Sequence, residues 1–406
     1  MDESRLSHPG WRVAGAYGAG VFFSTLPFYA FAVFLKPLAS ELGESRQAVA
    51  AAYGAMAAVA ALAAPLVGLL LDRRSARSIA APALALTGCA FASLAAFSPQ
   101  LGSLYVIFVL LGLGASGGSA LAYSRAVSAW FDRRRGLALG LVMSGGALGG
   151  MLHPPAAQAL IRLFGWRTAY LVLGGVIFVA GVPIVGLFVR ECAATRAGTG
   201  AALLEPVAGA TVAEALRSRV FWILVIVVFG STLASNGAIV HLSALLTDRG
   251  VAAGRAALAV SAMGGASLAG RLATGWLLDR FSAPRVSFAL LALAAAGTAL
   301  LAGAHSFAAG ALAAALIGFG IGGELDVTPY LLARTFGLRS ISTLYGLTWT
   351  ALGLAGAAGP ILLGRAFDAT GSYTLRFLQL AAGTLAVAAL MLTLPAGPAP
   401  RPPSPP

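Results

Sequence analysis

Stretches of about 20 mainly apolar residues recur along the whole chain, and this repetition limits the possible folds more than any other feature. Each stretch is long enough to cross a hydrocarbon core of about 30 Å as an α-helix. The composition agrees, because 59% of the 406 residues are hydrophobic and only 10% are charged. Soluble domains carry about 25% charged residues. The sequence therefore predicts an all-α integral membrane protein with many spans.

Twelve spans are expected. They are placed at 13–35, 47–71, 78–97, 102–128, 136–161, 168–189, 220–246, 255–278, 286–304, 308–332, 341–364 and 374–395. The longest polar stretch lies between the sixth and seventh spans and predicts a linker, and the Pro-rich end predicts a disordered tail. The expected organisation is an N-terminal six-helix bundle at 1–190, a cytoplasmic linker at 191–218, a C-terminal six-helix bundle at 219–396 and a tail at 397–406.

The two halves of the chain repeat each other. The pattern Gly-x-x-x-Asp-Arg at 68–73 recurs at 275–280, and the pattern Gly-x-x-Thr at 165–168 recurs at 371–374. The two offsets are 275 − 68 = 207 and 371 − 165 = 206. Landmarks at nearly one offset predict two pseudo-symmetric six-helix bundles, an arrangement found in many secondary transporters.

Arginine indicates the topology. Arginines concentrate in the loops after spans 2, 4, 8 and 10, whereas the loop after span 3 has none and the loop after span 9 has only His305. Because positive charge marks cytoplasmic loops, the even-numbered loops and both termini are expected in the cytoplasm. The net charge of +13 is then explained by the arginines of the cytoplasmic loops, and no nucleic-acid partner is expected. The Arg- and Ala-rich composition favours a bacterial inner membrane.

Arg271 lies near the middle of span 8, and between Arg255 at the start of that span and Asp279 after its end there is no other charge. A guanidinium at membrane depth costs about 2.5–3.5 kcal/mol on insertion scales, so it must face protein or water. Its planar fork of donors matches a carboxylate, which makes Arg271 the candidate anchor for an anionic substrate. The alternatives are a structural ion pair with Glu324 or Asp326, or a contact in a gate.

Glu324 and Asp326 lie two residues apart in span 10. Carboxyl groups at this depth are costly unless they are paired or protonated. Their side chains point about 200° apart on a helix, so at most one faces a cavity squarely. Glu324 is the preferred proton-coupling group, and Asp326 shares the coupling or gating role. One of them is expected to pair with an arginine on the cytoplasmic side, such as Arg125 or Arg334; alternatively, both are structural.

Two histidines, His153 and His241, lie at membrane depth and could relay protons because histidine titrates near neutral pH. The alternative for each is a hydrogen-bonded packing residue. Other polar and aromatic side chains within the spans are candidates to line a substrate cavity, although ordinary packing or an interface belt is the better explanation for most of them. These candidates are Phe28, Tyr123, Asn236 and Trp349.

The two Gly-x-x-x-Asp-Arg loops are expected to form a cytoplasmic gate. Their charges would form ion pairs that hold the cytoplasmic ends of the two halves together and that break and reform during transport. Alternatively, they would only stabilise the fold. The gate residues are Asp72, Arg73, Asp279, Arg280 and Arg125. The sequence has no nucleotide-binding motif, metal cluster or nucleophile–base pair, so we expect no enzyme, no metal and no cofactor other than a coupling proton.

These features resemble the major facilitator superfamily over nearly the full length. The segments 130–140, 164–167 and 322–337, together with Gly270-Arg271, are similar to the monocarboxylate porter group, which includes oxalate:formate antiporters and lactate transporters. The resemblance implies the major facilitator fold and alternating access about a site at the midplane. It also implies that an arginine at the place of Arg271 binds a carboxylate.

Two departures from the group refine this expectation. Oxalate carriers of this kind pair that arginine with a second cation in span 11, but 341–364 contains no Lys or Arg. Span 1 also lacks the lysine of animal lactate carriers, since it is uncharged until Lys36. We therefore expect a monomeric, proton-coupled transporter of a monocarboxylate such as lactate or pyruvate. An oxalate/formate-type antiporter, a drug exporter and a transporter-like sensor remain alternatives.

Overall fold

The computed structural model describes residues 9–117, 130, 135–189, 209–337 and 339–395. The chain divides into two compact units, Met1–Leu204 and Glu205–Pro406. Helices make up nearly all of the described residues, and the only β-pairing among them is an isolated antiparallel bridge between Gly209 and Gly337. The expected all-α class is confirmed.

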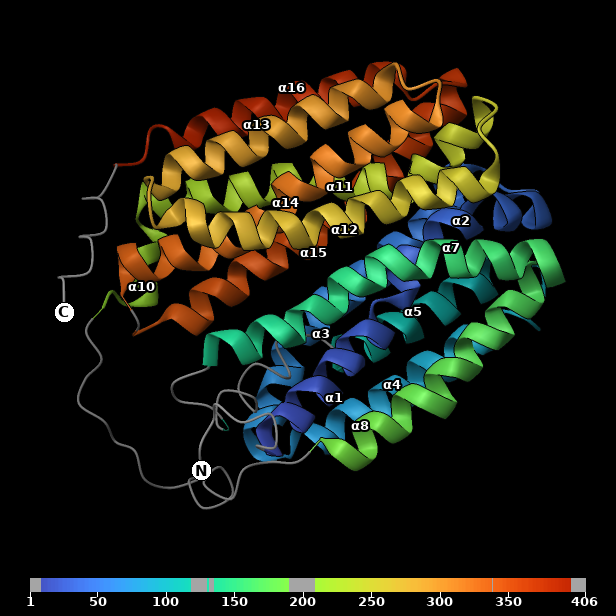
Figure 1. Ribbon diagram of the computed structural model, residues 1–406, viewed down its shortest axis with the longest axis horizontal. Coiled ribbons are helices and arrows are strands. Elements are labelled where there is room, and N and C mark those ends of the chain that lie inside the picture. Colours follow the sequence, from blue (N-terminus) through green and yellow to red (C-terminus); the bar gives the residue numbers. More distant parts are fainter. Residues whose placement is uncertain (1–8, 118–129, 131–134, 190–208, 338, 396–406) are drawn as a thin grey trace. The chain divides into compact units, whose positions relative to one another are not determined.

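Unit 1 is a bundle of long helices (Figure 1). Its helices are α1 (Pro9–Ser24), α2 (Leu26–Leu42), α3 (Arg46–Arg73), α4 (Ala76–Ser93), α5 (Leu101–Gly117), α7 (Arg135–Val176), the π-helix η1 (Ile177–Gly181) and α8 (Val182–Phe188). Helix α7 packs against α1, α2 and α4, and α5 packs between α3 and α4.

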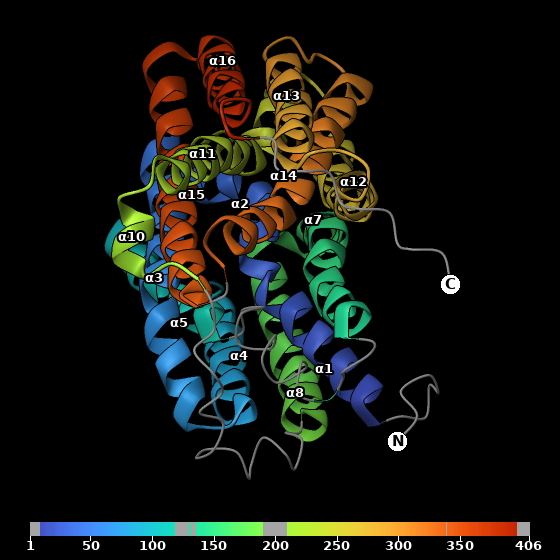
Figure 2. The same cartoon turned by 90° about the vertical axis from the view of Figure 1, so that its left-hand side faces the viewer.

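Unit 2 begins with a short helix and continues as a second bundle (Figure 2). Its helices are α10 (Val212–Leu216), α11 (Arg219–Asp248), α12 (Ala253–Leu278), α13 (Ala283–Ala302), α14 (Phe307–Phe336), α15 (Ile341–Thr370) and α16 (Thr374–Met391). Helix α14 packs against α12 and α13, while α11 packs against α15 and α16. Apolar side chains from most of these helices form one continuous buried core.

Most expected spans correspond to one helix, with three departures. Span 1 is broken at Thr25 into α1 and α2. Spans 5 and 6 run together as α7, which turns at Gly165, and span 6 then continues through η1 into α8. Span 4 is described only to Gly117. Nine helical stretches among the described residues are long and apolar enough to cross a membrane. The tail at 397–406 and linker residues 191–208 lie outside the described residues.

The repeated glycines have a physical explanation. Gly165 and Gly371 occupy equivalent places in the two halves and both have positive φ, at 80° and 67°. The same holds for Gly43 and Gly250, at 63° and 84°. A residue with a Cβ adopts this left-handed region only at a cost, whereas glycine does not. The sequence repeat therefore preserves the turns that end equivalent helices.

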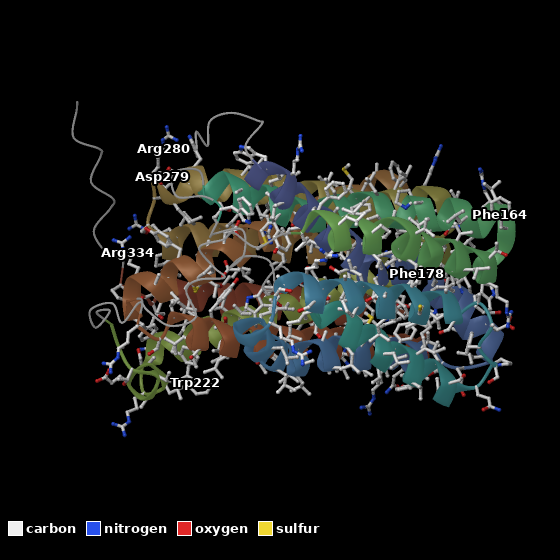
Figure 3. The ribbon with its side chains drawn as sticks, turned by 90° about the horizontal axis from the view of Figure 1, so that it is seen from below. Phe164, Phe178, Trp222, Asp279, Arg280 and Arg334 are labelled. Atoms are coloured by element: carbon white, nitrogen blue, oxygen red, sulfur yellow. The ribbon has the colours of Figure 1, made fainter. Side chains whose placement is uncertain are left out.

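Large apolar side chains cover the outer surfaces of both units. Val179 of unit 1 is 76% exposed and Leu272 of unit 2 is 73% exposed, and Figure 3 shows the half-exposed Trp222 at the edge of unit 2. Such exposure in water would mark an aggregation-prone surface. In a membrane, helices that satisfy their own backbone hydrogen bonds can expose such apolar side chains to lipid. The chain is a multi-pass membrane protein.

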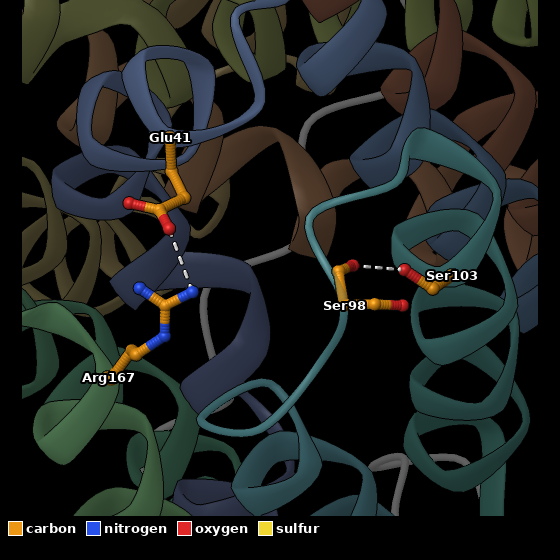
Figure 4. Close-up of polar contacts among 4 residues, drawn as sticks. All are labelled: Glu41, Ser98, Ser103 and Arg167. Carbon is orange, nitrogen blue, oxygen red and sulfur yellow. Dashed lines mark hydrogen bonds and ion pairs between the residues drawn. The ribbon is translucent and has the colours of Figure 1, made fainter.

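One end of unit 1 is held by a salt bridge between α2 and α7. Arg167 Nη2 lies 2.8 Å from Glu41 Oε1 (Figure 4). The Arg167 guanidinium also lies over the Trp166 ring, 4.3 Å from its centroid. These contacts explain why the segment 164–167 carries both an aromatic and a basic residue directly after the Gly165 turn.

Unit 2 has a different clamp, formed by Arg249 at the end of α11. Arg249 Nη1 donates to the carbonyl oxygens of Leu301 and Ala304, and Nη2 donates to that of Ala302, each at 2.8 Å. Nη2 also reaches Thr374 Oγ1 at 3.3 Å. The last carbonyls of α13 have no partner within the helix, and Arg249 satisfies them while tying α11 to α13 and α16.

Replacing Arg249 by alanine is expected to lower the stability of unit 2 by about 2 kcal/mol, because charged hydrogen bonds to carbonyls are lost at a half-buried, partly screened position. The apparent melting temperature of the purified full-length protein in detergent measures the loss. Arg255→Ala is the control, since Arg255 is exposed near the start of α12. Equal melting temperatures for the two variants would show that the clamp is not stabilising.

Candidate functional site in unit 2

Helices α12 and α14 approach each other at backbone contact. A Cβ on Gly270 would collide with the carbonyl oxygen of Phe319, and one on Gly318 would collide with that of Met263. A Cβ on Gly322 would likewise collide with the Ser267 carbonyl oxygen. Small residues allow this close packing between membrane helices. As a result, residue 271 of α12 and residue 326 of α14 lie beside each other.

Arg271 and Asp326 form an ion pair at this contact. Arg271 Nη1 lies 3.6 Å from Asp326 Oδ1, and the two side chains are 22% and 44% exposed. A bidentate guanidinium–carboxylate pair has contacts of about 2.7–2.9 Å, so this pair is loose. The guanidinium is accessible and its fork is not filled by the aspartate.

Among the described residues, the cation beside Asp326 is Arg271, the ion pair that the sequence offered as an alternative, and not Arg334. Asp326 contacts Arg271, whereas Arg334 Nη1 donates to Tyr330 Oη at 3.0 Å. Residue 334 is eight positions further along α14, a rise of about 12 Å, which is too far for contact. Arg125 lies outside the described residues.

Glu324 points to another side of α14. Its side chain is 3% exposed, and its Oε2 accepts a hydrogen bond of 2.6 Å from Ser287 Oγ of α13. The carboxyl group also lies within hydrogen-bonding reach of Thr328 one turn later, although Oε1 and Thr328 Oγ1, both buried, make no bond of good geometry among the described residues. The two carboxyl groups are therefore separated as the helical geometry predicts: Asp326 meets the cation and Glu324 is enclosed.

A small pocket lies next to Glu324 and is partly open at its mouth. It is lined from α11, α14 and α15, and its wall combines hydroxyl groups with apolar and aromatic side chains. The lining residues are Val228, Ser231, Thr232, Ile321, Glu324, Thr328, Tyr345, Thr348, Trp349 and Leu352. Small-molecule sites typically have such a wall, mainly apolar with a few polar groups.

Tyr345 connects the pocket with the ion pair. It lines the pocket and packs edge-to-face on Trp349, with ring centroids 6.0 Å apart and planes at 88°. It is also close enough to Arg271 and Asp326 to interact electrostatically with both. Tyr345 is thus the residue of the pocket wall that interacts with the Arg271–Asp326 pair.

The remaining candidates of unit 2 lie outside this cluster. His241 is fully buried: Nδ1 lies 3.0 Å from Tyr373 Oη, and Nε2 lies 2.9 Å from the Pro360 carbonyl oxygen. These contacts tie α11 to α15 and to the start of α16, and they are those of a packing histidine. Asn236 donates to the Thr232 carbonyl at 3.4 Å and faces Gly356 of α15. Trp349 alone of the predicted lining residues of unit 2 is in the pocket wall.

Two of the candidates in unit 1 are described in full. His153 is 3% exposed, its ring nitrogens have no hydrogen-bond partner among the described residues, and its ring lies 4.4 Å from that of Phe22. Phe28 packs edge-to-face on Tyr53 at 6.1 Å. Tyr123 lies outside the described residues, and so do the side chains of the gate residues Asp72 and Arg73.

The gate residues of unit 2 lie at one end of their bundle. Asp279 ends α12, and Figure 3 shows it next to Arg280 and near Arg334. The Arg280 guanidinium lies over the Trp276 ring, 3.9 Å from its centroid. A cation–π contact of this kind contributes about 0.5–1 kcal/mol at an exposed site, so Arg280 is held at the surface of α12. The opening and closing role stays a prediction.

Adding a side chain at Gly270, where α12 touches α14, is expected to disturb the Arg271–Asp326 ion pair. Gly270→Ala would push α12 away from the Phe319 carbonyl and cost about 1–3 kcal/mol through overpacking. We expect a lower melting temperature and weaker anion binding together. Gly254→Ala is the matched control in α12, because nothing lies within 4 Å of a Cβ built there. If Gly270→Ala behaved like Gly254→Ala in both assays, the close packing would not position Arg271.

Comparison with known proteins defines the class. The sequence matches the Major Facilitator Superfamily over residues 17–360, and the chain belongs to that family. It is therefore a membrane transporter of small molecules and not an enzyme. Among solved structures, a bacterial homolog of the human lysosomal transporter Spinster, in an inward-facing and occupied conformation, has a TM-score of 0.70 at 16% identity and covers 97% of this chain and 96% of its own. At this identity the likeness concerns the fold.

Curated relatives include the monocarboxylate transporters. Monocarboxylate transporter 11 of Homo sapiens is 31% identical over 391 residues, which cover 91% of this chain and 79% of that protein. Monocarboxylate transporter 13 of Bos taurus is 30% identical and covers 74% of this chain and 70% of its own length. The expected resemblance to the monocarboxylate porter group is confirmed.

Proposed function

We propose that this chain transports a small monocarboxylate, such as lactate or pyruvate, together with a proton across the cell inner membrane. The observation that carries the proposal is Arg271, an accessible guanidinium within an apolar helix whose only carboxylate partner among the described residues is a loosely held aspartate. The names of the curated relatives support the same substrate class.

In the proposed cycle the substrate carboxylate takes the place of Asp326 at Arg271. A carboxylate that is free to align with the guanidinium makes two charge-assisted hydrogen bonds, whereas Asp326 makes one contact at 3.6 Å. Binding thus replaces a poor internal pair with a better one. The neutralised site then allows alternating access, in which the two halves move about the bound substrate.

The proposed proton carrier is Glu324. Its carboxyl group is enclosed, makes one hydrogen bond to Ser287, and has no cation beside it among the described residues. An ionised carboxylate in such a place is strongly disfavoured, so the group takes up a proton when it is closed off from water. One proton on Glu324 and one anion on Arg271 make the loaded transporter electroneutral relative to its empty form.

The remaining parts of the proposal follow from the sequence. Both termini and the even-numbered loops lie in the cytoplasm, Asp279 and Arg280 belong to the cytoplasmic gate, and the monomer is the functional unit. His241 is proposed as a packing residue that fixes α11, and His153 retains its proposed role in coupling.

Uptake into proteoliposomes with and without preloaded anion distinguishes proton-coupled transport from anion exchange. Vesicles without internal anion are expected to accumulate labelled L-lactate when the outside is more acidic, because the proton gradient supplies the driving force. An exchanger would need preloaded anion and would ignore the gradient. Accumulation that occurs only in preloaded vesicles would replace the proposal with an antiporter of the oxalate/formate kind.

A further inference from the structure

We propose that the small pocket beside Glu324 holds one water molecule, and that this water passes the coupling proton between Glu324 and the mouth of the pocket. The inference rests on the proposed function and extends it, because it supplies the path by which the enclosed carboxyl group gains and loses its proton. It makes Thr328 and Thr348 positioning residues for proton coupling.

The pocket suits a water molecule in size and in polarity. It has room for about one water molecule, which is too little for a carboxylic acid of three carbons, and its mouth is partly open. A buried water needs about two to four polar partners. The wall supplies such partners from α11, α14 and α15: the carboxyl group of Glu324 and the hydroxyl groups of Ser231, Thr232, Thr328 and Thr348.

Glu324 has hydrogen-bonding capacity left for this water. Its Oε2 accepts from Ser287 Oγ at 2.6 Å, and Thr328 lies within hydrogen-bonding reach of the carboxyl group. An ionised carboxylate has about four lone-pair sites on its two oxygens, so two protein hydroxyl groups leave room for a third donor. Glu324 Oε1 makes no bond of good geometry among the described residues, and a water in the adjoining pocket supplies one.

Two hydroxyl groups on α11 and α15 can accept a hydrogen bond from the same water. Thr348 Oγ1 donates to the Tyr345 carbonyl at 2.7 Å, and Ser231 Oγ donates to the Val227 carbonyl at 2.7 Å. Because each hydroxyl proton is directed to a carbonyl of its own helix, the oxygen in the pocket wall keeps only its accepting capacity. The water therefore donates to α11 or α15 while it also bonds to Glu324 on α14.

A water in this position serves both protonation states of the carboxyl group. It donates to the ionised carboxylate and accepts from the protonated acid, because water is both a donor and an acceptor. To load the carrier, the water takes up a proton at the mouth of the pocket and gives one of its own protons to Glu324 Oε1. The water is regenerated in this step, and unloading runs it in reverse.

Uptake and exchange in proteoliposomes test the relay, because only net uptake requires Glu324 to gain and lose its proton in every cycle. Thr328→Val and Thr348→Val keep the side-chain shape and remove a hydroxyl from the pocket wall. Each is expected to slow gradient-driven L-lactate uptake by about tenfold, the effect of one lost hydrogen bond, and to leave lactate–lactate exchange within about twofold. Thr328→Ser and Thr348→Ser keep the hydroxyl and are expected to retain most of the uptake rate.

Thr298→Val is the matched control. Thr298 is buried in α13 and bonds to the Ala294 carbonyl, much as Thr348 bonds to the Tyr345 carbonyl, but it does not line the pocket. The same change at the two positions therefore removes a similar internal hydrogen bond, and only one of the changes touches the water. If Thr298→Val slowed net uptake as Thr348→Val does, the effect would be one of packing and the relay would be wrong.

Glu324→Gln separates the relay from the proposed function. If Glu324→Gln abolishes gradient-driven accumulation while both valine variants take up lactate at the wild-type rate, the relay is wrong and the proton carrier stands. The relay is also wrong if the valine variants slow exchange as much as net uptake. If Glu324→Gln accumulates lactate as wild type does, the proton carrier and the relay fail together.

Discussion

Arg271→Ala is expected to weaken monocarboxylate binding by about 100-fold and to reduce uptake to background. Removing one partner of a hydrogen-bonded charge pair in a site with little water costs about 2–5 kcal/mol, and each 1.4 kcal/mol corresponds to a factor of ten. Arg271→Lys is expected to recover only part of the loss. An ammonium keeps the charge but not the planar fork that matches a carboxylate.

The measurement is calorimetric titration of wild type and variants with L-lactate, after size-exclusion chromatography has shown that each variant is folded. Arg255→Ala is the matched control, because Arg255 is an exposed arginine in the same helix. It should bind lactate as wild type does. If Arg271→Ala bound lactate with unchanged affinity, the anion would have to sit elsewhere and the site in unit 2 would be abandoned.

Glu324→Gln is expected to uncouple transport from the proton gradient. Glutamine has nearly the same shape and can keep the hydrogen bond from Ser287, but it cannot bind and release a proton. One unit of pH gradient corresponds to about 1.4 kcal/mol, which sustains about tenfold accumulation for one proton per anion. The variant should exchange lactate across the membrane while the accumulation ratio falls to about one.

Asp326→Asn provides the comparison for this experiment. Its carboxylate contacts Arg271 and is 44% exposed, so we expect gradient-driven accumulation to persist with an altered lactate affinity. Accumulation ratios in proteoliposomes at several imposed pH gradients distinguish the two variants. If Asp326→Asn lost coupling and Glu324→Gln retained it, the roles of the two carboxyl groups would be reversed.

The fold and the main charges of the site were predictable because both depend on local pattern. Apolar length defines the spans, and a charge inside a span is conspicuous whatever surrounds it, which is why Arg271, Glu324 and Asp326 could be singled out. The opposed directions of Glu324 and Asp326 follow from helical geometry alone. The Arg271–Asp326 pair was one of several alternatives from the sequence, and the choice among them depends on the register of α12 against α14, which backbone contacts at Gly270 and Gly318 fix.

Other residues of the site left no local signal. Ser287 and Tyr345 belong to types that are common in membrane helices, and their importance lies in the neighbours that tertiary packing gives them. Arg249 resembles any loop arginine until its contacts with carbonyls 52 to 55 residues away are known. His241 likewise has partners 119 and 132 residues away. Such partners come from tertiary packing, which periodicity does not encode.

The most direct test of the central claim is uptake of radiolabelled L-lactate into proteoliposomes that contain the purified full-length protein, with and without an inward proton gradient. Lactate is expected to accumulate above its external concentration only when the gradient is present, and this accumulation is expected to be lost in Arg271→Ala. Folded wild-type protein that moves no lactate, or that moves it equally well without the gradient, would contradict proton-coupled monocarboxylate transport.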